Sequence, residues 1–212
     1  MYRNRIKRLL DILLSACGIL CLSWLLLLLA VAIKLDSPGP VFFRQKRVGI
    51  GKRHFQILKF RTMRIDTPHD MPTHLLHDPD QYITRMGHFL RKTSLDELPQ
   101  LLNILKGDLS IVGPRPERPE IAAQYCEEMP EFALRLQAKA GLTGYAQVYG
   151  KYNTTPYDKL QMDLMYIAHP SLIEDLKIML ATVKILFMPE STEGVAEGAT
   201  TAMEQQCEET GK

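Results

Sequence analysis

The sequence predicts an α/β protein that is mostly helical, with a small β-hairpin and an N-terminal helix inserted in a membrane. Three observations predict this fold class. A long apolar run occupies the N-terminus, two strand-like runs follow it, and leucine-rich helical patterns separated by proline and glycine make up the rest. The 212 residues suffice for a small domain plus a membrane segment. We expect a membrane-anchoring helix at 1–35, a folded domain at 36–188 and a disordered acidic tail at 189–212.

The apolar run is the strongest single signal. No charged residue occurs between Ile12 and Ile33, and as a helix this stretch is about 33 Å long, enough to cross the hydrocarbon core of a bilayer. A signal peptide is the alternative, because a basic segment precedes the run and Ala30-Val31-Ala32 resembles a cleavage site. Its apolar region would be longer than signal peptides usually have, which favours an anchor.

Basic residues flank the run on both sides. They are Arg3, Arg5, Lys7 and Arg8 before it, and Lys34, Arg44, Lys46, Arg47, Lys52 and Arg53 after it. Since basic flanks tend to stay in the cytoplasm, a simple span cannot satisfy both. A re-entrant helix, which enters one leaflet, bends and returns, satisfies both. Gly18 and Ser23 are positions at which such a bend is tolerated.

A turn and a hairpin follow the apolar run. Residues 36–40 carry turn chemistry, and the strand-like runs Val41–Val48 and His54–Met63 are joined by a glycine-containing turn. Residues 37 to 65 contain many basic residues and no acidic one. A solvated edge strand or RNA binding would fit these residues, but beside a membrane anchor we favour anionic lipid headgroups or a phosphorylated substrate and expect no nucleic acid.

The segment TSLDELPQLLNIL, at 93–105, places Asp96 and Glu97 before a helical pattern and after a short helix expected near Tyr82–Leu90. Ser94 and Glu97 have the spacing of a capping box, and Asp96 would favour the positive end of the helix dipole. A helix cap is therefore the simple interpretation of the two carboxylates, and catalysis is the alternative.

Two loops contain residues suited to phosphate binding. Arg115 lies between Pro114 and Pro116, which restrict its backbone, and a rigidly held guanidinium suits phosphate; a surface turn is the alternative. Gly141 and Gly144 would allow backbone N–H groups to face an anion, although an ordinary loop would show the same pattern. Further on, residues 171–187 mix apolar residues with lysine and predict an amphipathic helix near the headgroups.

The cysteines and histidines show neither a zinc spacing nor a disulfide framework, which suits a reducing compartment.

Taken in order, several motifs resemble the bacterial sugar transferases, which are monotopic phosphoglycosyl transferases acting on polyprenyl phosphate. The resemblance runs from about Lys7 to Met188 and is to the small form of the family. Members usually carry Ser-Pro in the membrane helix, where this chain has Ser23-Trp24. The motifs are RLLDILLS, KLDSPGPVFFRQKRVG, FQILKFRTM, LRKTSLDELPQLLNILKGDLSIVGPRPE, GLTGYAQV and MDLMYI…SLIEDLKIM.

The resemblance implies roles for individual residues. Asp96 would be the nucleophile that attacks the β-phosphorus of a UDP-sugar and releases UMP, leaving a phosphosugar on the aspartate. Asp96 and Glu97 would also hold a magnesium ion, Mg2+, at the diphosphate. The implied substrate-binding residues are Lys59, Arg91, Arg115, Thr143, Gly144, Gln147, Lys151 and Asp163.

The resemblance also implies partners and a location. The acceptor would be a polyprenyl phosphate such as undecaprenyl phosphate, and the domain would lie on the cytoplasmic face of a bacterial inner membrane, in contact with its lipids. The reaction would be the first membrane step of a surface glycan pathway. A second copy of the chain or the glycosyltransferases of later steps are candidate protein partners. A non-catalytic membrane-bound scaffold is the alternative, and release of UMP distinguishes the two.

Overall fold

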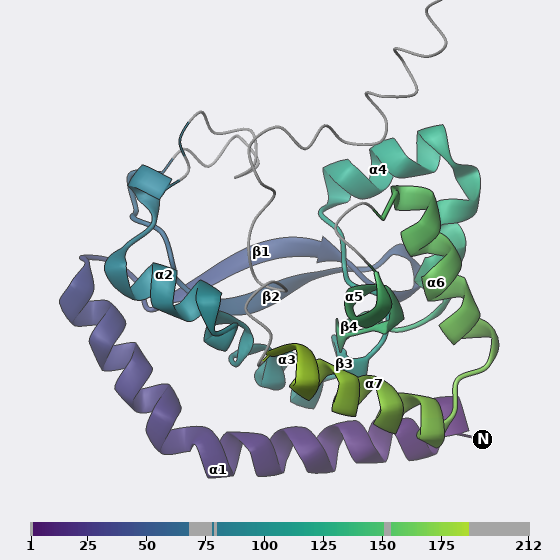
Figure 1. The fold of residues 1–212 in the computed structure, drawn as a ribbon, viewed down its shortest axis with the longest axis horizontal. Coiled ribbons are helices and arrows are strands. Elements are labelled where there is room, and N and C mark those ends of the chain that lie inside the picture. The colour runs from purple at the N-terminus through teal and green to yellow at the C-terminus, as the bar shows by residue number, and fades with distance from the viewer. Residues whose placement is uncertain (1, 68–77, 79, 151–153, 187–212) are drawn as a thin grey trace, which may run out of the picture.

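The computed structural model describes residues 2–67, 78, 80–150 and 154–186. In these residues the fold is the expected mostly helical α/β class, with a long apolar helix α1 (Lys7–Asp36) along one side and two small two-stranded sheets above it in the view of Figure 1. The other strands and helices are β1 (Phe42–Val48), β2 (His54–Phe60), α2 (Arg85–Lys92), α3 (Gln100–Lys106), β3 (Ser110–Val112), α4 (Pro119–Glu128), β4 (Gly141–Thr143), α5 (Tyr145–Tyr149), α6 (Pro156–Ala168) and α7 (Leu172–Leu186). The tail expected to be disordered, 189–212, lies outside the described residues.

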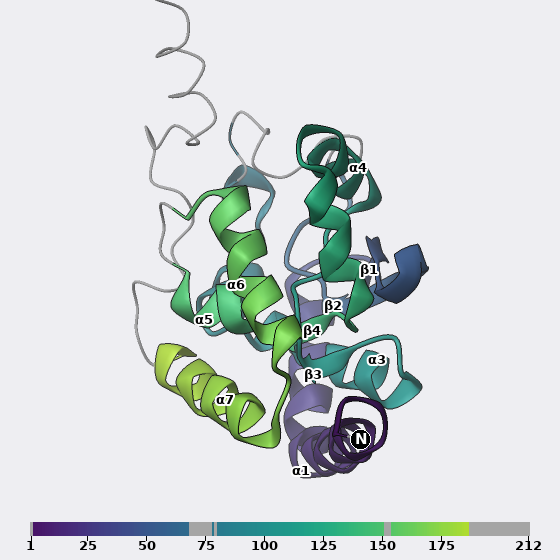
Figure 2. The same cartoon turned by 90° about the vertical axis from the view of Figure 1, so that its right-hand side faces the viewer.

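Helix α1 is bent. In Figure 1 it runs along the lower edge of the molecule from the N-terminus and then turns upward, and Figure 2 shows the same two arms. Ser15 and Ser23 each donate a hydrogen bond to a carbonyl one turn earlier, an interaction that favours helix bending. In the described part of the chain, α1 is the one helix long and apolar enough to cross a membrane, and little of its apolar stretch is buried.

The N-terminal arm of α1 is fixed to the domain by polar contacts. The Asp11 carboxylate accepts hydrogen bonds from the Ser110 hydroxyl at 3.1 Å and from the Ile111 N–H at 2.9 Å. Arg8 donates to the carbonyls of Ile104 and Leu105 at the C-terminal end of α3, where a positive charge and extra donors are favourable. This arm is therefore attached to β3 and α3.

The C-terminal arm of α1 is fixed to the same domain by a different set of contacts. Leu29 and Ile33 are buried in one cluster with Phe60 of β2 and Leu90 of α2. Asp36 accepts a hydrogen bond from the Met86 N–H at 3.1 Å, in the first turn of α2, where a carboxylate is favourable. Both arms of α1 thus contact one folded domain.

The predicted hairpin is confirmed, with a shorter second strand. Strands β1 and β2 are antiparallel, and their register sets Phe43 opposite Lys59, so these two side chains share a face of the hairpin. The second strand ends at Phe60 rather than Met63. Arg61, just beyond it, is buried and donates to the carbonyls of Ser37 and Pro38, which ties the end of β2 to the turn after α1.

A second sheet, which the sequence analysis did not predict, is formed by the parallel strands β3 and β4. Three glycines allow its backbones to approach closely, since a Cβ on Gly113, Gly141 or Gly144 would lie within 2.3 Å of a backbone atom. The Gly141 N–H donates to the Pro114 carbonyl at 2.9 Å. The N–H of Gly141 is therefore used in close backbone packing, and anion binding by other N–H groups of this loop stays a prediction.

The predicted amphipathic helix is present as α7, which lies beside α1 in both views (Figures 1 and 2). The buried Asp175 carboxylate joins the two helices, because it accepts hydrogen bonds from Tyr2, Lys7 and Tyr166. Much of the exposed surface of α7 is apolar, as is that of α1, although Lys177 and Lys184 are exposed as well. The exposed apolar residues of α7 are Leu172, Ile173, Leu176, Leu180, Val183 and Leu186.

Candidate active site

Asp96 and Glu97 lie in a single 3-10 turn, Leu95–Glu97, and not in the first turn of α3. Ser94 has a φ of 56° in the left-handed region, and its side chain makes no capping hydrogen bond. A helix N-cap residue is normally extended, and its hydroxyl then meets the free N–H groups. The predicted capping box is therefore wrong. Helix α3 begins after Pro99, which is suited to a helix start.

The Glu97 carboxylate is held by three side chains. Lys59 Nζ lies 2.5 Å and Arg115 Nη2 3.1 Å from Glu97 Oε1, and the Gln100 side-chain amide donates to Oε2. Burial alone would raise the pKa of Glu97, but the charges and hydrogen bonds of Arg115 and Lys59 outweigh it and lower the pKa. Glu97 is therefore an ionised carboxylate in a fixed orientation.

The Asp96 carboxylate is shielded from solvent but much less restrained. Lys59 Nζ lies 3.8 Å from its Oδ2, and no described residue donates a hydrogen bond to this carboxylate. Burial raises the pKa of Asp96, and the positive charges of Lys59 and Arg91 offset this only in part. A carboxylate without hydrogen-bond donors is available for attack on an electrophile.

Asp96 lines a cavity of about 430 Å³ between the hairpin and α2. Among the described residues, Asp96 is the only acidic residue in its wall, whereas the wall holds many cationic side chains. Arg91, one of them, is fixed by a hydrogen bond from its Nε to Thr62 Oγ1 at 3.0 Å. Such a cavity suits a ligand with several negative charges, such as a diphosphate. The cationic residues are Arg47, Lys59, Arg61, Arg64, Arg91 and Arg118.

The backbone of Arg115, which is predicted to bind phosphate, is held in place by a hydrogen bond from Arg135. The Arg135 guanidinium donates to the Arg115 carbonyl at 3.0 Å and forms a buried ion pair with Asp163 at 2.6 Å. The exposed fractions of the two ion-paired side chains are only 6% and 2%. Asp163 therefore does not contact Asp96 or Glu97, but acts on the loop that carries Arg115.

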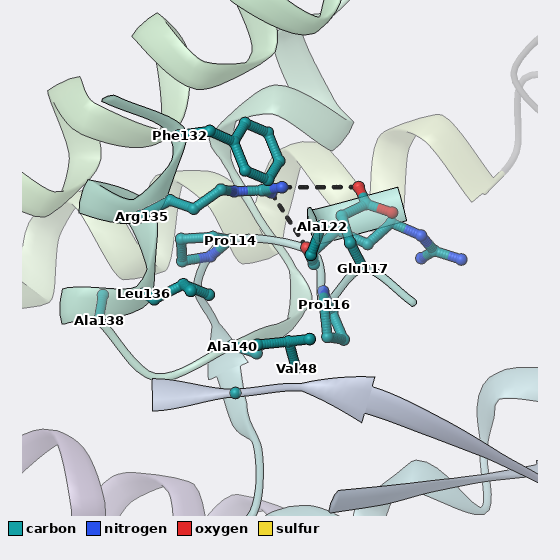
Figure 3. A pocket seen from close by; sticks show the side chains of 12 residues that line it. Val48, Pro114, Pro116, Glu117, Ala122, Phe132, Arg135, Leu136, Ala138 and Ala140 are labelled. Atoms are coloured by element: carbon teal, nitrogen blue, oxygen red, sulfur yellow. Dashed lines mark hydrogen bonds and ion pairs between the residues drawn. The ribbon is translucent and has the colours of Figure 1, made fainter. Parts of the chain in front are cut away.

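Figure 3 shows how tightly Arg135 is enclosed. Its guanidinium lies against the ring of Phe132, 4.6 Å from the centroid, and points toward Glu117, whose Oε1 is 3.5 Å away. The side chains of Pro114 and Pro116 line the same small pocket. Sequence reasoning missed Arg135, because a lone arginine in a helical stretch gives no sign of burial.

The remaining predicted substrate ligands have local partners in the structure. The Thr143 and Thr182 hydroxyls are hydrogen-bonded at 2.7 Å, Gly144 packs against Gly113, and the Gln147 side chain donates to the Leu142 carbonyl at 3.1 Å. Their binding roles stay predictions. Lys151 lies outside the described residues.

The side chains of the site can be compared with those that a magnesium ion needs. In the part of the chain that the structure describes, no group of three or more His, Cys, Asp and Glu side chains could hold a metal ion. Magnesium, however, usually takes one or two carboxylates and completes its shell with water and substrate phosphates. The adjacent carboxylates of Asp96, in the wall of a cationic cavity, and of Glu97, its neighbour in the chain, fit that kind of site.

A carboxylate in the wall of a cationic cavity, with a second carboxylate beside it in the chain, suits phosphorylated ligands, and the long apolar helix is consistent with membrane association. Residues 2–189 match the bacterial sugar transferase family. Since the match covers most of the chain, this protein belongs to that family. The resemblance seen in the motifs is confirmed, and with it the expectation of an enzyme.

Three individual relatives show how similar this chain is to other proteins. A UDP-glucose:undecaprenyl-phosphate glucose-1-phosphate transferase of Caulobacter vibrioides is 46% identical over 192 residues, covering 87% of this chain and 71% of that protein. A UDP-N-acetylgalactosamine-undecaprenyl-phosphate N-acetylgalactosaminephosphotransferase of Aeromonas hydrophila is 41% identical, covering 85% and 43%. The Bacillus subtilis sugar transferase EpsL is 38% identical, covering 87% and 89%. This chain thus spans less than half of the Aeromonas protein and most of the other two.

Proposed function

We propose that this protein transfers a sugar-1-phosphate from a UDP-sugar to undecaprenyl phosphate and releases UMP. The names of the Caulobacter and Aeromonas relatives describe this kind of transfer with different sugars. The observation that carries the proposal is the site itself: Asp96, to which no described residue donates a hydrogen bond, lines a cationic cavity, and the neighbouring Glu97 is held by Lys59 and Arg115. A scaffold without activity would not require this arrangement.

The proposed reaction has two steps, both at Asp96. First, an Asp96 carboxylate oxygen attacks the β-phosphorus of the UDP-sugar, and the bond to the bridging oxygen breaks, so that UMP leaves with the electron pair. The phosphosugar is then bonded to Asp96 as a mixed anhydride. Second, a phosphate oxygen of undecaprenyl phosphate attacks the same phosphorus and expels the Asp96 carboxylate. The enzyme is restored, and the lipid carries the sugar diphosphate.

The chain's own residues stabilise the charge that develops in these steps. Lys59 lies near both carboxylates. Arg91 is fixed by its hydrogen bond to Thr62, and Arg115 by its hydrogen bond to Glu97. Cations placed on non-bridging oxygens are the main protein contribution to phosphoryl transfer. A magnesium ion, held by Asp96 and Glu97, would neutralise part of the diphosphate charge when bound.

We further propose that α1 is re-entrant and that the domain lies on the cytoplasmic face of the bacterial inner membrane. Contacts at both arms support this, since Asp11 bonds to Ser110 and Ile111 while Asp36 bonds to Met86 of the same domain. A helix spanning the bilayer would leave one arm on the opposite side. The exposed apolar side of α7 would then lie at the headgroups.

Product analysis tests the proposed function. Purified protein in detergent or nanodiscs is incubated with magnesium, undecaprenyl phosphate and either UDP-glucose or UDP-N-acetylgalactosamine, together with further UDP-sugars. We expect UMP and a lipid-linked sugar diphosphate from at least one donor. Release of UDP instead would indicate transfer of the sugar alone, and absence of turnover with every donor would favour the scaffold. A role in the first membrane step of a surface glycan pathway would follow from the lipid product.

A further inference from the structure

The cavity that contains Asp96 continues into an apolar rim. We use this name for the cavity-lining residues Pro40, Phe42, Phe43, Met63 and Ile65. Phe43 is 39% exposed and Ile65 is 54% exposed, although both are large apolar side chains. Phe43 is paired across the hairpin with Lys59, whose Nζ lies 3.8 Å from Asp96. Phe43 of the rim therefore lies opposite the lysine that contacts the proposed nucleophile.

The rim also lies where the chain leaves the membrane helix. Helix α1 ends at Asp36, and Pro40 follows after a single turn. Arg61 fixes this turn to the end of β2 through the carbonyls of Ser37 and Pro38. Ile65 packs against Gly39, where a Cβ would lie 2.6 Å from its Cγ2. In Figure 1, β1 begins beside the upper end of α1.

The two substrates of the proposed reaction reach Asp96 from different environments. A UDP-sugar is soluble and arrives from the cytosol, whereas the hydrocarbon of a polyprenyl phosphate is held in the bilayer by the cost of exposing it to water. The lipid phosphate must nevertheless enter the cationic cavity. Its first isoprene units then need an apolar surface between the membrane and Asp96, and the rim is an exposed apolar surface that follows the end of α1 and lines the same cavity as Asp96.

We propose that the apolar rim binds the isoprene units next to the phosphate of the polyprenyl acceptor. The inference rests on the proposed function and adds the acceptor's path to it. Phe43 is the central contact, because it is exposed and shares the hairpin face of Lys59. Phe42 contributes less to binding, since its ring already stacks on Phe60 at 5.6 Å between centroids.

The test separates the two half-reactions in Phe43→Ala and Ile65→Ser. Ile50→Ser is the matched control, because Ile50 is 43% exposed at the hairpin turn and does not line the cavity. The first half-reaction is followed as UMP released and phosphosugar bound to Asp96 without acceptor. The second is followed as turnover against the concentration of undecaprenyl phosphate, and of farnesyl phosphate as a short acceptor.

We expect both rim variants to form the Asp96 adduct at the wild-type rate, while their KM for undecaprenyl phosphate rises about tenfold, as loss of one apolar contact would give. Farnesyl phosphate should show the same rise, since the contact is with the units next to the phosphate. Ile50→Ser should match wild type, and thermal unfolding checks that all variants are folded.

Three results would overturn the proposal. A slower adduct formation with a higher KM for UDP-sugar would mean that the rim binds the nucleotide. An equal effect of Ile50→Ser would indicate a general change at the membrane surface, and rim variants that match wild type would show that the rim does not bind the acceptor. Failure of the wild-type protein itself to form an adduct would instead refute the proposed function on which the inference rests.

Discussion

At the scale of single residues, Asp96 and Glu97 differ although they are neighbours in the chain. Burial raises the pKa of Asp96, while the charges of Arg115 and Lys59 lower the pKa of Glu97 against the effect of burial. Environments that shift the pKa values of two neighbouring carboxyl groups apart are typical of sites where the groups have separate tasks. Asp96 is thus suited to bond formation, and Glu97 to holding charge in place.

This difference predicts opposite effects on stability. A carboxyl group with a raised folded-state pKa gives stability that is present below its unfolded pKa and is lost as the pH rises through the folded value. In magnesium-free buffer at neutral pH, Asp96→Asn should therefore leave the free energy of unfolding unchanged or raise it. Glu97→Gln should lower it, because Glu97 has a lowered pKa and its stabilisation is present above the unfolded pKa and lost as the pH falls through the folded value.

Denaturant unfolding of the two variants in detergent, at neutral pH and again near pH ~4, measures both effects. The difference between Glu97→Gln and wild type should shrink at the lower pH. A loss of about 0.5–2 kcal/mol in Asp96→Asn, the usual cost of removing a helix cap, would contradict the structure of this turn.

The buried Arg135–Asp163 pair should affect activity through Arg115. Asp163→Asn keeps the size of the side chain but removes the charge that holds Arg135 against the Arg115 carbonyl. We expect it to slow UMP release in the wild-type background and to have little further effect in Arg115→Ala, since residues acting as a unit are not additive. Glu174→Gln, which breaks the exposed pair with Lys177, is the control. Additive losses in the double variant would show that the pair acts elsewhere.

At the scale of helices and strands, composition predicted α1, α7 and the hairpin, because a long apolar run and period-two strands are unambiguous patterns. It did not predict β3 and β4, each three residues long, because close backbone packing and an ordinary glycine loop give the same sequence. The start of α3 was misplaced since Pro99, and not Ser94, determines it. The motifs led to Asp96, Glu97, Lys59 and Arg115, whereas Arg135 depends on tertiary burial that no local pattern reveals.

The topology of α1 is the prediction that belongs to this scale. In a variant without native cysteines, Arg5→Cys and Lys52→Cys place exposed thiols on the two sides of the apolar run. Both should resist a membrane-impermeant thiol reagent in intact cells and react after permeabilisation, because both arms of α1 contact the same domain, which we propose to be cytoplasmic. Reaction of just one of them in intact cells would indicate a helix that spans the bilayer.

At the scale of the whole molecule, α1 and α7 lie side by side (Figures 1 and 2), and both carry exposed apolar residues. The cationic cavity lies between the hairpin and α2. α1 contributes to the core through Leu29 and Ile33, so this long apolar helix is also part of the folded domain. Removal of residues 1–34 should therefore disrupt the folded domain, while the exposed apolar residues of α7 should leave residual membrane affinity. In the proposed reaction, this arrangement would let a soluble donor and a lipid acceptor meet at Asp96.

The central claim is that Asp96 forms the bond to the phosphosugar. The most direct measurement is the mass of the peptide containing Asp96 after the full-length protein is incubated with an accepted UDP-sugar and magnesium, without polyprenyl phosphate. The wild-type peptide should gain the mass of one phosphosugar and lose it when undecaprenyl phosphate is added. Folded Asp96→Asn should gain no mass and release no UMP, because an amide is a far poorer nucleophile than a carboxylate. Near-normal turnover by folded Asp96→Asn would contradict the claim.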